Sequence, residues 1–300
     1  MEASHATALQ SAQAGGWRQV VADYVALTKP KVQSLLLLTT VCTMQIAGDP
    51  SIELIALTVL GGYLSAGGAG AVNHWFDRDI DALMPRTANR PVPAGRVSPR
   101  AALVYGVVLA ALSFVLLAAT VNLLAASLAL AGFLGYVFVY TIWLKRRTPQ
   151  NIVIGGAAGA VPPLVGWAAV TGGLGGMPLY LFAIVFFWTP PHFWALSLLM
   201  KKEYERVGVP MLPVVRGERE TRRQILLYAV LLWAVTQLPF CAGGLGALYL
   251  VASLVLGGLF IAGAVVLYRR ADRRSALRLY LFSLAYLALL FGAMVADVKL

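Results

Sequence analysis

The stretch NHWFDRDIDALMPRTANRP, at positions 73–91, gathers acidic, basic and amide side chains in an otherwise apolar chain. Asn73, Asp77 and Asp81 are four residues apart, so a continuing helix would hold all three on one face. Two carboxylates and an amide suit Mg²⁺, which takes one or two carboxylates and fills its other positions with water and phosphate oxygens. The spacing therefore predicts a metal site, with Asp79 pointing elsewhere and available to pair with an arginine.

Two arginines, Arg86 and Arg90, follow the aspartates. Guanidinium groups match phosphate oxygens bidentately, so carboxylates for a metal and arginines for an anion together describe a diphosphate site. The alternative is a solvated loop in which aspartates and arginines only pair with one another. The periodic acidic face, the glycine-rich segment before it and a second loop of mixed charge favour the diphosphate site.

The composition identifies a membrane protein, because 59% of the residues are hydrophobic and only 12% are charged. A bilayer-spanning helix needs about 20 apolar residues. We therefore expect an all-α polytopic membrane protein with nine transmembrane helices around a central cavity. The nine expected segments are 32–48, 52–72, 100–120, 123–143, 151–170, 178–200, 224–242, 245–267 and 276–297.

The basic residues predict the orientation, because retained cytoplasmic loops collect Lys and Arg. With nine helices and the N-terminus inside, 23 of the 24 Lys and Arg fall on one side and only Lys299 on the other. The expected topology is N-in and C-out, in the inner (cytoplasmic) membrane of a bacterium, with the site facing the cytoplasm. Orientation accounts for the net charge of +11, so we expect the lipid bilayer and no nucleic acid as a partner.

The chain is divided here into a cytoplasmic tail, residues 1–27, and one transmembrane domain, residues 28–300. Apolar side chains at helical spacing from Trp17 to Val25 predict a short interfacial helix in the tail. The tail has no secretory signal, and Cys42 and Cys241 are expected to be packing residues. The two mixed-charge loops lie four helices apart, which suggests an internal repeat of helices 1–4 and 5–8.

Several blocks of the sequence resemble a known family. NHWFDRDIDALMPRTANRPVPAG is similar to the NxxxDxxxD region of the intramembrane UbiA-type prenyltransferases. TPQNIVIGGAAGAVPPLVGW, WTPPHFWALSL and GVPMLPVV resemble the protohaem IX farnesyltransferases, or haem O synthases, within that superfamily. The resemblance runs from about Thr28 to about Val215, and the last three helices add only hydropathy.

The resemblance implies an enzyme that ionises farnesyl diphosphate with Mg²⁺ and joins the farnesyl group to a vinyl group of haem B, after which water is added. Haem B would be a substrate and Mg²⁺ the cofactor. Asn73, Asp77 and Asp81 would be catalytic and hold the first metal. Lys145 and Arg146, just before TPQN, are secondary candidates for contacting diphosphate or the haem propionates. An enzyme that converts haem O to haem A is a candidate partner.

The second motif of the superfamily is commonly DxxxD, but the corresponding segment here reads KKEYERVGVP. Glu203 stands where these farnesyltransferases usually carry Asp, beside Tyr204, and both residues are carried over as catalytic candidates. Glu203 is expected to ligate Mg²⁺ directly or through water. Lys201 or Lys202 is expected to contact phosphate.

The three histidines are expected to differ. His5 lies in a polar tail and has no assigned role. His74 either lines the rim of the cavity or is an interfacial polar residue. His192 follows Pro190 and Pro191, where a helix must kink or break. This intramembrane imidazole either holds the haem or satisfies carbonyls released by the prolines.

Two other functions compete with haem farnesylation. A prenyltransferase of the same superfamily would use the same diphosphate chemistry on an aromatic acid or quinone precursor. A transporter would move a haem or a phosphorylated lipid without chemistry. Metal-dependent release of diphosphate separates an enzyme from a transporter.

Overall fold

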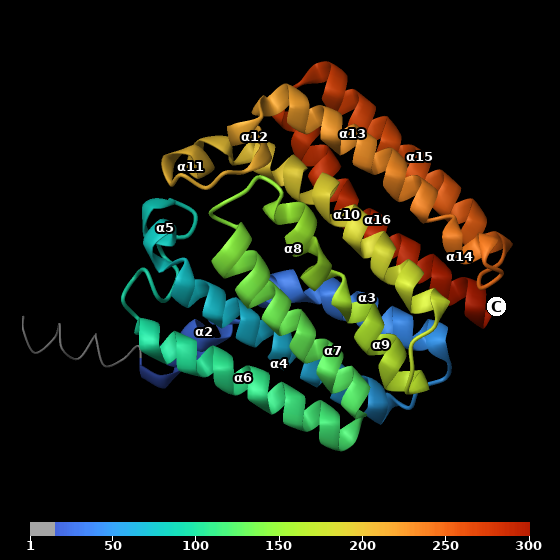
Figure 1. Ribbon diagram of the computed structural model, residues 1–300, viewed down its shortest axis with the longest axis horizontal. Helices are drawn as coiled ribbons and strands as arrows, with labels where there is room; N and C mark the ends of the chain where they lie inside the picture. Colours follow the sequence, from blue (N-terminus) through green and yellow to red (C-terminus); the bar gives the residue numbers. More distant parts are fainter. Residues whose placement is uncertain (1–15) are drawn as a thin grey trace, which may run out of the picture.

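The computed structural model describes residues 16–300, which form helices and turns with no strand among them (Figure 1). His5 lies outside these residues. The helices of the bundle are α3 (Pro30–Ala47), α4 (Ile52–Phe76), α6 (Pro99–Thr120), α7 (Leu123–Leu134) with its π-helical continuation η1 (Gly135–Leu144), α8 (Asn151–Gly159), α9 (Val161–Thr171), α10 (Gly176–Leu199), α13 (Gly217–Val235), α15 (Ala247–Arg270) and α16 (Arg273–Lys299). The remaining helices are α2 (Gly16–Leu27), α5 (Arg78–Leu83), α11 (Lys201–Arg206), α12 (Leu212–Val215) and α14 (Leu238–Cys241).

Eight segments of the described chain are helical, long enough and apolar enough to cross a membrane. They coincide within a few residues with eight of the nine expected spans, because an uninterrupted apolar run of this length is a strong signal. The exception at the N-terminal side is α3, which is helical over its 18 residues but less apolar, because Lys31, Gln33 and Gln45 interrupt it. The helical, membrane-spanning architecture is confirmed, while the count of nine spans stays a prediction.

The first and last long helices lie side by side, which closes the bundle (Figure 1). α16 packs against α3, α10 and α15, while α10 also packs against α13. On the other side α4 packs against α6, and α3 against α9. One large apolar cluster extends over the half of the bundle formed by α10, α13, α15 and α16. Smaller clusters fill the half formed by α4, α6, α7 and α9.

Glycines allow α4 and α6 to approach each other closely, which fixes the position of the polar end of α4. A Cβ added to Gly68 would lie 2.6 Å from the carbonyl oxygen of Gly106, and one on Gly106 would lie 2.7 Å from that of Gly68. Small residues at such a crossing bring two helix backbones into contact inside a membrane. Ser113 of α6 also donates to the Gly61 carbonyl at 2.7 Å.

Two proline pairs have different effects on the helices. Pro190 and Pro191 lie inside α10, which continues through them from Gly176 to Leu199, so the expected break is not seen. Pro162 and Pro163 follow the boundary at Ala160, where α8 ends and α9 begins. Proline in the first turn of a helix costs no hydrogen bond, so α9 can begin at this proline pair. The fifth expected span therefore consists of two shorter helices, α8 and α9.

Candidate active site

The three predicted metal-ligating residues lie at the end of α4 and in α5. The Asp77 N–H donates to the Asn73 carbonyl at 2.9 Å, and the Asp81 N–H donates to the Asp77 carbonyl at 2.8 Å. The i to i+4 ladder thus passes through the junction, although Asp77 leaves helical geometry with φ −87° and ψ 6°. Asn73, Asp77 and Asp81 are all buried, with at most 3% of each residue exposed. The expected polar face is therefore formed, with a bend at its centre.

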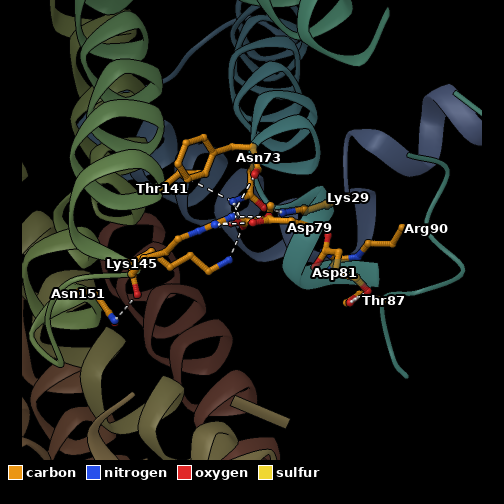
Figure 2. Close-up of polar contacts among 12 residues, drawn as sticks. Lys29, Asn73, Asp79, Asp81, Thr87, Arg90, Thr141, Lys145 and Asn151 are labelled. Atoms are coloured by element: carbon orange, nitrogen blue, oxygen red, sulfur yellow. Dashed lines mark hydrogen bonds and ion pairs between the residues drawn. The ribbon is translucent and has the colours of Figure 1, made fainter. Parts of the chain in front are cut away.

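Asn73 lies among the polar contacts drawn in Figure 2, and its side chain contacts that of Asp77. The Asn73 amide donates to Asp77 Oδ2 at 2.7 Å and to Thr141 Oγ1 at 3.2 Å. Lys29 Nζ donates to Asn73 Oδ1 at 2.6 Å, and Lys145 Nζ donates to Asp77 Oδ2. Burial and the neighbouring cations lower the pKa of Lys29 to about 7.

Asp81 has partners of its own in the segment that follows α5 (Figure 2). Arg90 Nη1 donates to Asp81 Oδ2 at 2.7 Å, and Thr87 Oγ1 donates to the Asp81 carbonyl at 2.9 Å. About a quarter of the Arg90 side chain is exposed. Arg86 is exposed on the same segment. Of the two predicted phosphate-binding arginines, Arg90 therefore contacts the acidic face directly.

Asp79 pairs with an arginine, as expected from its position off the acidic face. Arg146 donates to both Asp79 carboxylate oxygens, at 2.6 and 2.7 Å. These hydrogen bonds lower the pKa of Asp79 to about 2 and raise that of Arg146. Arg146 also donates to the Phe76 carbonyl at 3.1 Å and lies 4.8 Å from the centre of the Phe76 ring. Its guanidinium group thus holds the α4–α5 junction in place.

The π-helix η1 supplies Thr141 to the cluster, and Lys145 follows directly at its C-terminal end. The Lys145 N–H donates to the Tyr140 carbonyl at 2.9 Å, a bond from residue i to residue i−5. Asn151, at the start of α8, donates to the Lys145 carbonyl at 3.2 Å. Short π-helical turns occur frequently at functional sites, where they change which side chains face inward.

The two mixed-charge segments meet through apolar side chains. Ile80 of α5 and Tyr204 of α11 belong to one cluster with Tyr140, Ile152 and Val209. Burial raises the pKa of Tyr204, while the charges of Arg86, Lys145 and Arg90 act in the opposite direction. Tyr204 is therefore close to the cations around Asp77 and Asp81.

The other predicted residues of the second segment have separate partners. Lys201 forms ion pairs with Glu218 at 3.4 Å and Glu205 at 3.7 Å, and Lys202 is exposed. Glu203 Oε2 is buried and has no hydrogen-bond partner within residues 16–300. Across the same residues, no three His, Cys, Asp or Glu side chains converge on one point. Glu203 therefore does not join Asp77 and Asp81 in a single carboxylate cluster.

His74 and His192 lie in different surroundings. His74 is 2% exposed, and neither of its ring nitrogens has a hydrogen-bond partner in the described chain. His192 Nδ1 shares a 2.6 Å hydrogen bond with Ser283 Oγ, and its ring stacks between Trp188 and Tyr280. The hydrogen bond of His192 is therefore made to a side chain of α16, and within residues 16–300 its imidazole makes no hydrogen bond with a carbonyl of α10.

The donor set fits Mg²⁺ in chemical type. Asp77 and Asp81 offer hard carboxylate oxygens, Asn73 offers an amide oxygen, and the partnerless Glu203 Oε2 lies in the neighbouring segment. Two carboxylates with room for substrate oxygens are the usual protein contribution to a Mg²⁺ site.

Two hollows open beside α13, outside the acidic face. The first has a volume of about 250 Å³ and is lined by Gln150, Trp194, Leu212, Arg216, Glu220, Gln224 and Tyr228. The second is lined by Arg216, Arg219, Glu220, Arg223 and Tyr268. Neither includes a residue of the Asn73, Asp77 and Asp81 cluster, so the central cavity stays a prediction.

Sequence reasoning missed Lys29 and Thr141 as members of this cluster. Lys29 was interpreted only as a residue that orients the chain in the membrane, and Thr141 as part of an apolar span. For Lys29 a local signal exists, because a basic residue immediately before a helix-initiating proline lies at the membrane boundary, level with the polar end of α4. Thr141 has no such signal.

The fold and the cluster together define a polytopic helical membrane protein with an acidic, cation-lined site at one end of its bundle. The sequence matches the UbiA prenyltransferase family over residues 35–290. It is 56% identical to a protoheme IX farnesyltransferase from Symbiobacterium thermophilum, covering 93% of this chain and 95% of the relative. The chain therefore belongs to the UbiA prenyltransferase family.

Other relatives are longer, and solved structures share the fold. A protoheme IX farnesyltransferase from Chloroflexus aurantiacus is 56% identical over 94% of this chain, which covers 48% of the relative. The chain thus spans about half the length of the first curated relatives that it matches. A digeranylgeranylglyceryl phosphate synthase superposes with a TM-score of 0.77 at 20% identity, covering 93% of this chain and 99% of the other. A UbiA homolog from Archaeoglobus fulgidus bound to DMAPP and Mg²⁺ superposes with a TM-score of 0.66 at 17% identity, covering 91% of this chain and 99% of the other.

Proposed function

We propose that this protein transfers the farnesyl group of farnesyl diphosphate to a vinyl group of haem B, with addition of water, to give haem O. The observation that carries the proposal is the 56% identity, over nearly the full length of both chains, to a relative named protoheme IX farnesyltransferase. The geometry at the end of α4 supports the diphosphate half of the reaction. The acceptor is supported by the relatives alone.

The diphosphate would bind between the acidic face and the cations around it. Asn73, Asp77 and Asp81 would hold Mg²⁺, which, when bound, supplies positive charge to the departing diphosphate oxygens. Lys145 and Arg90 would donate to the same diphosphate, because each side chain forms an ion pair with a carboxylate of the acidic face. Positive charge aimed at a developing anion in a site with little water is the main way in which proteins assist such a departure.

The second segment would complete this site. Tyr204 is supported by its burial and by its position near the cations of the first segment. Glu203 has a buried carboxylate oxygen with no hydrogen-bond partner in the described part of the chain, which supports a second metal contact made directly or through water. Arg86, Lys201 and Lys202 are exposed or half-exposed basic side chains on these two segments and would receive the phosphate end of the substrate.

The π electrons of the haem vinyl group would then bond to the farnesyl cation, and water would add to the carbon left positive and release one proton. His192 would hold the haem or orient it, because its imidazole lies in an aromatic cluster inside the membrane. His74 is a further candidate for lining the site. Arg146 would act by holding the α4–α5 junction.

The proposal extends to the arrangement in the membrane. α3 would be the ninth span, and α2 would lie at the cytoplasmic interface with Trp17, Val20 and Val25 toward lipid, since all three are exposed. The N-terminus would face the cytoplasm, supported by the distribution of Lys and Arg. The four-helix repeat, a bacterial inner membrane location and contact with a haem A synthase are parts of the same proposal.

The test uses the purified protein in detergent with haem B and farnesyl diphosphate, with and without Mg²⁺, and follows the extracted haem by mass. A Mg²⁺-dependent gain of one farnesyl group and one water is expected. Release of diphosphate with unchanged haem would refute the acceptor and favour an aromatic or quinone precursor. If folded protein changes neither substrate, the prenyltransferase proposal is wrong and transport becomes the better explanation.

A further inference from the structure

Three cationic side chains each contact one of the three groups to which the proposed function assigns Mg²⁺. Lys29 Nζ donates to Asn73 Oδ1 at 2.6 Å, Arg90 Nη1 donates to Asp81 Oδ2 at 2.7 Å, and Lys145 Nζ donates to Asp77 Oδ2. They come from three separate places along the chain. Each therefore meets its partner only through the fold.

A cation and a metal ion would crowd each other at these oxygens. Mg²⁺ binds oxygen at about 2.1 Å, so an ammonium group on the same oxygen would lie only about 4 Å from the metal. Two positive charges at that separation repel strongly, especially where the groups are buried. Entry of Mg²⁺ thus requires the lysine or arginine to move to another acceptor.

The only strong acceptor that enters with the metal is the diphosphate. Lys145 and Arg90 already balance the two carboxylates of Asp77 and Asp81, and Lys29 adds further positive charge whenever it is protonated. Mg²⁺ alone would add two more positive charges, whereas a diphosphate ester brings about three negative charges at neutral pH. Charge balance is reached when metal and diphosphate are both present.

The backbone at Lys29 indicates that its side chain matters. Lys29 has φ 54° and ψ 54°, a left-handed conformation that glycine adopts freely and lysine adopts at a cost. The turn lies close against α4, where a Cβ on Gly70 would be 3.0 Å from the Leu27 carbonyl oxygen. Glycine would suit this turn better, so the lysine contributes something that glycine lacks, namely the ammonium group at Asn73.

We propose that Lys29, together with Lys145 and Arg90, is an exchangeable counterion that leaves the metal-ligating oxygens to bind the diphosphate when the diphosphate enters, which frees those oxygens for Mg²⁺. This inference rests on the proposed function for the identity of the metal ligands. As a consequence, Mg²⁺ binds weakly when diphosphate is absent. Diphosphate binds even when Mg²⁺ is absent, and each ligand strengthens the binding of the other. Lys29 is assigned as a diphosphate-binding residue that competes with the metal.

The test measures the two ligands separately on the full-length protein in detergent. Mn²⁺, in place of Mg²⁺, is titrated by EPR with no diphosphate present, and inorganic pyrophosphate is titrated by calorimetry with EDTA present. Lys29→Met is expected to bind Mn²⁺ at least about fivefold more tightly, because a competing charge is gone. The same variant is expected to bind pyrophosphate at least about fivefold more weakly, because a charge-assisted hydrogen bond is lost.

Lys31→Met is the matched control, since Lys31 is exposed two residues further along. It should change neither affinity. A structural role for Lys29 would weaken both ligands or neither, so opposite changes are specific to counterion exchange. Lys29→Gly, which relieves the left-handed strain, replaces Lys29→Met if the latter does not fold, and Lys145→Met should show the same pair of opposite changes.

The variant Asp77→Asn distinguishes a failure of the counterion inference from a failure of the metal assignment. If Asp77→Asn abolishes Mn²⁺ binding but Lys29→Met leaves the Mn²⁺ affinity unchanged or lower, the counterion inference is wrong and the metal assignment stands. If Asp77→Asn leaves Mn²⁺ binding unchanged, the metal ligands of the proposed function are wrong, and the inference fails with them.

Discussion

Replacing Asp77 by asparagine tests the centre of the candidate site. Asp77 has no exposed surface and accepts hydrogen bonds from Asn73 at 2.7 Å and from Lys145, while Arg146 lies 3.4 Å away. Asparagine keeps the size and part of the hydrogen bonding but removes the charge. We expect the variant to fold and to lose nearly all turnover.

The magnitudes follow from the surroundings of Asp77. Lys145 keeps 14% of its side chain exposed and can turn toward water, so the lost ion pair should cost about 2–3 kcal/mol of stability, less than the stability of a typical domain. Removal of a group that stabilises charge in a buried site typically lowers kcat by about 10²–10³, or about 3–4 kcal/mol. Loss of a metal ligand should reach at least the upper end of this range.

Asp79→Asn is the matched control, because it removes the same charge two residues away. The Asp79 side chain is 59% exposed, and an exposed ion pair such as that with Arg146 contributes about 1 kcal/mol or less. The assay is the initial rate of haem modification, with thermal unfolding in detergent as the test of folding. The reasoning is refuted if Asp77→Asn keeps more than a tenth of the activity, or if Asp79→Asn loses as much activity as Asp77→Asn.

Three further predictions concern haem binding and packing. His192→Ala should lower haem affinity without unfolding the protein, measured by haem titration in detergent, and unchanged affinity would exclude His192 from haem binding. Gly68→Val should lower the thermal unfolding midpoint by several degrees, because its Cβ would already lie 2.6 Å from the Gly106 carbonyl, whereas Gly258→Val, with open space, should not. Asn122→Ala should cost about 1–2 kcal/mol, because its side chain caps α7 at Ala125 and donates to Ala168 of α9; an unchanged unfolding midpoint would contradict both contacts.

The spans could be predicted because each one is an apolar run with charged or turn residues at both ends. The N-terminal helix α2 was also predicted, and the pairing of Asp79 with an arginine followed from its position off the acidic face. Asn73, Asp77 and Asp81 follow one another at helical spacing because the i to i+4 hydrogen-bond ladder continues through the α4–α5 junction. The spans, α2 and the acidic face depend on local interactions along the chain, whereas Asp79 pairs with Arg146, 67 residues away, so only the type of its partner could be predicted.

The partners of the two lysine counterions could not be predicted from local pattern. Lys29 is 44 residues from Asn73, and Lys145 is 68 residues from Asp77. Which cation meets which oxygen depends on how α3 and η1 pack against α4, and apolar helices carry little periodic signal about which face turns inward. Orientation in the membrane is a sufficient explanation for Lys29, and the position of Lys145 before TPQN indicates a secondary candidate without identifying Asp77 as its partner.

The π-helix explains why helical periodicity could not place Lys145 beside Asp77. A regular α-helix through η1 would give each residue a rotation of about 100°, and one extra residue in a turn rotates everything after it by about the same angle. With an α-helical register, the Lys145 N–H would bond the Thr141 carbonyl instead of that of Tyr140, and its side chain would turn away from Asp77. Thr141 and Lys145 both contact the Asn73–Asp77 pair only because this segment departs from the 3.6-residue period. A periodicity analysis assumes that period throughout, so it fails at the segment where the departure brings the cation to the carboxylate.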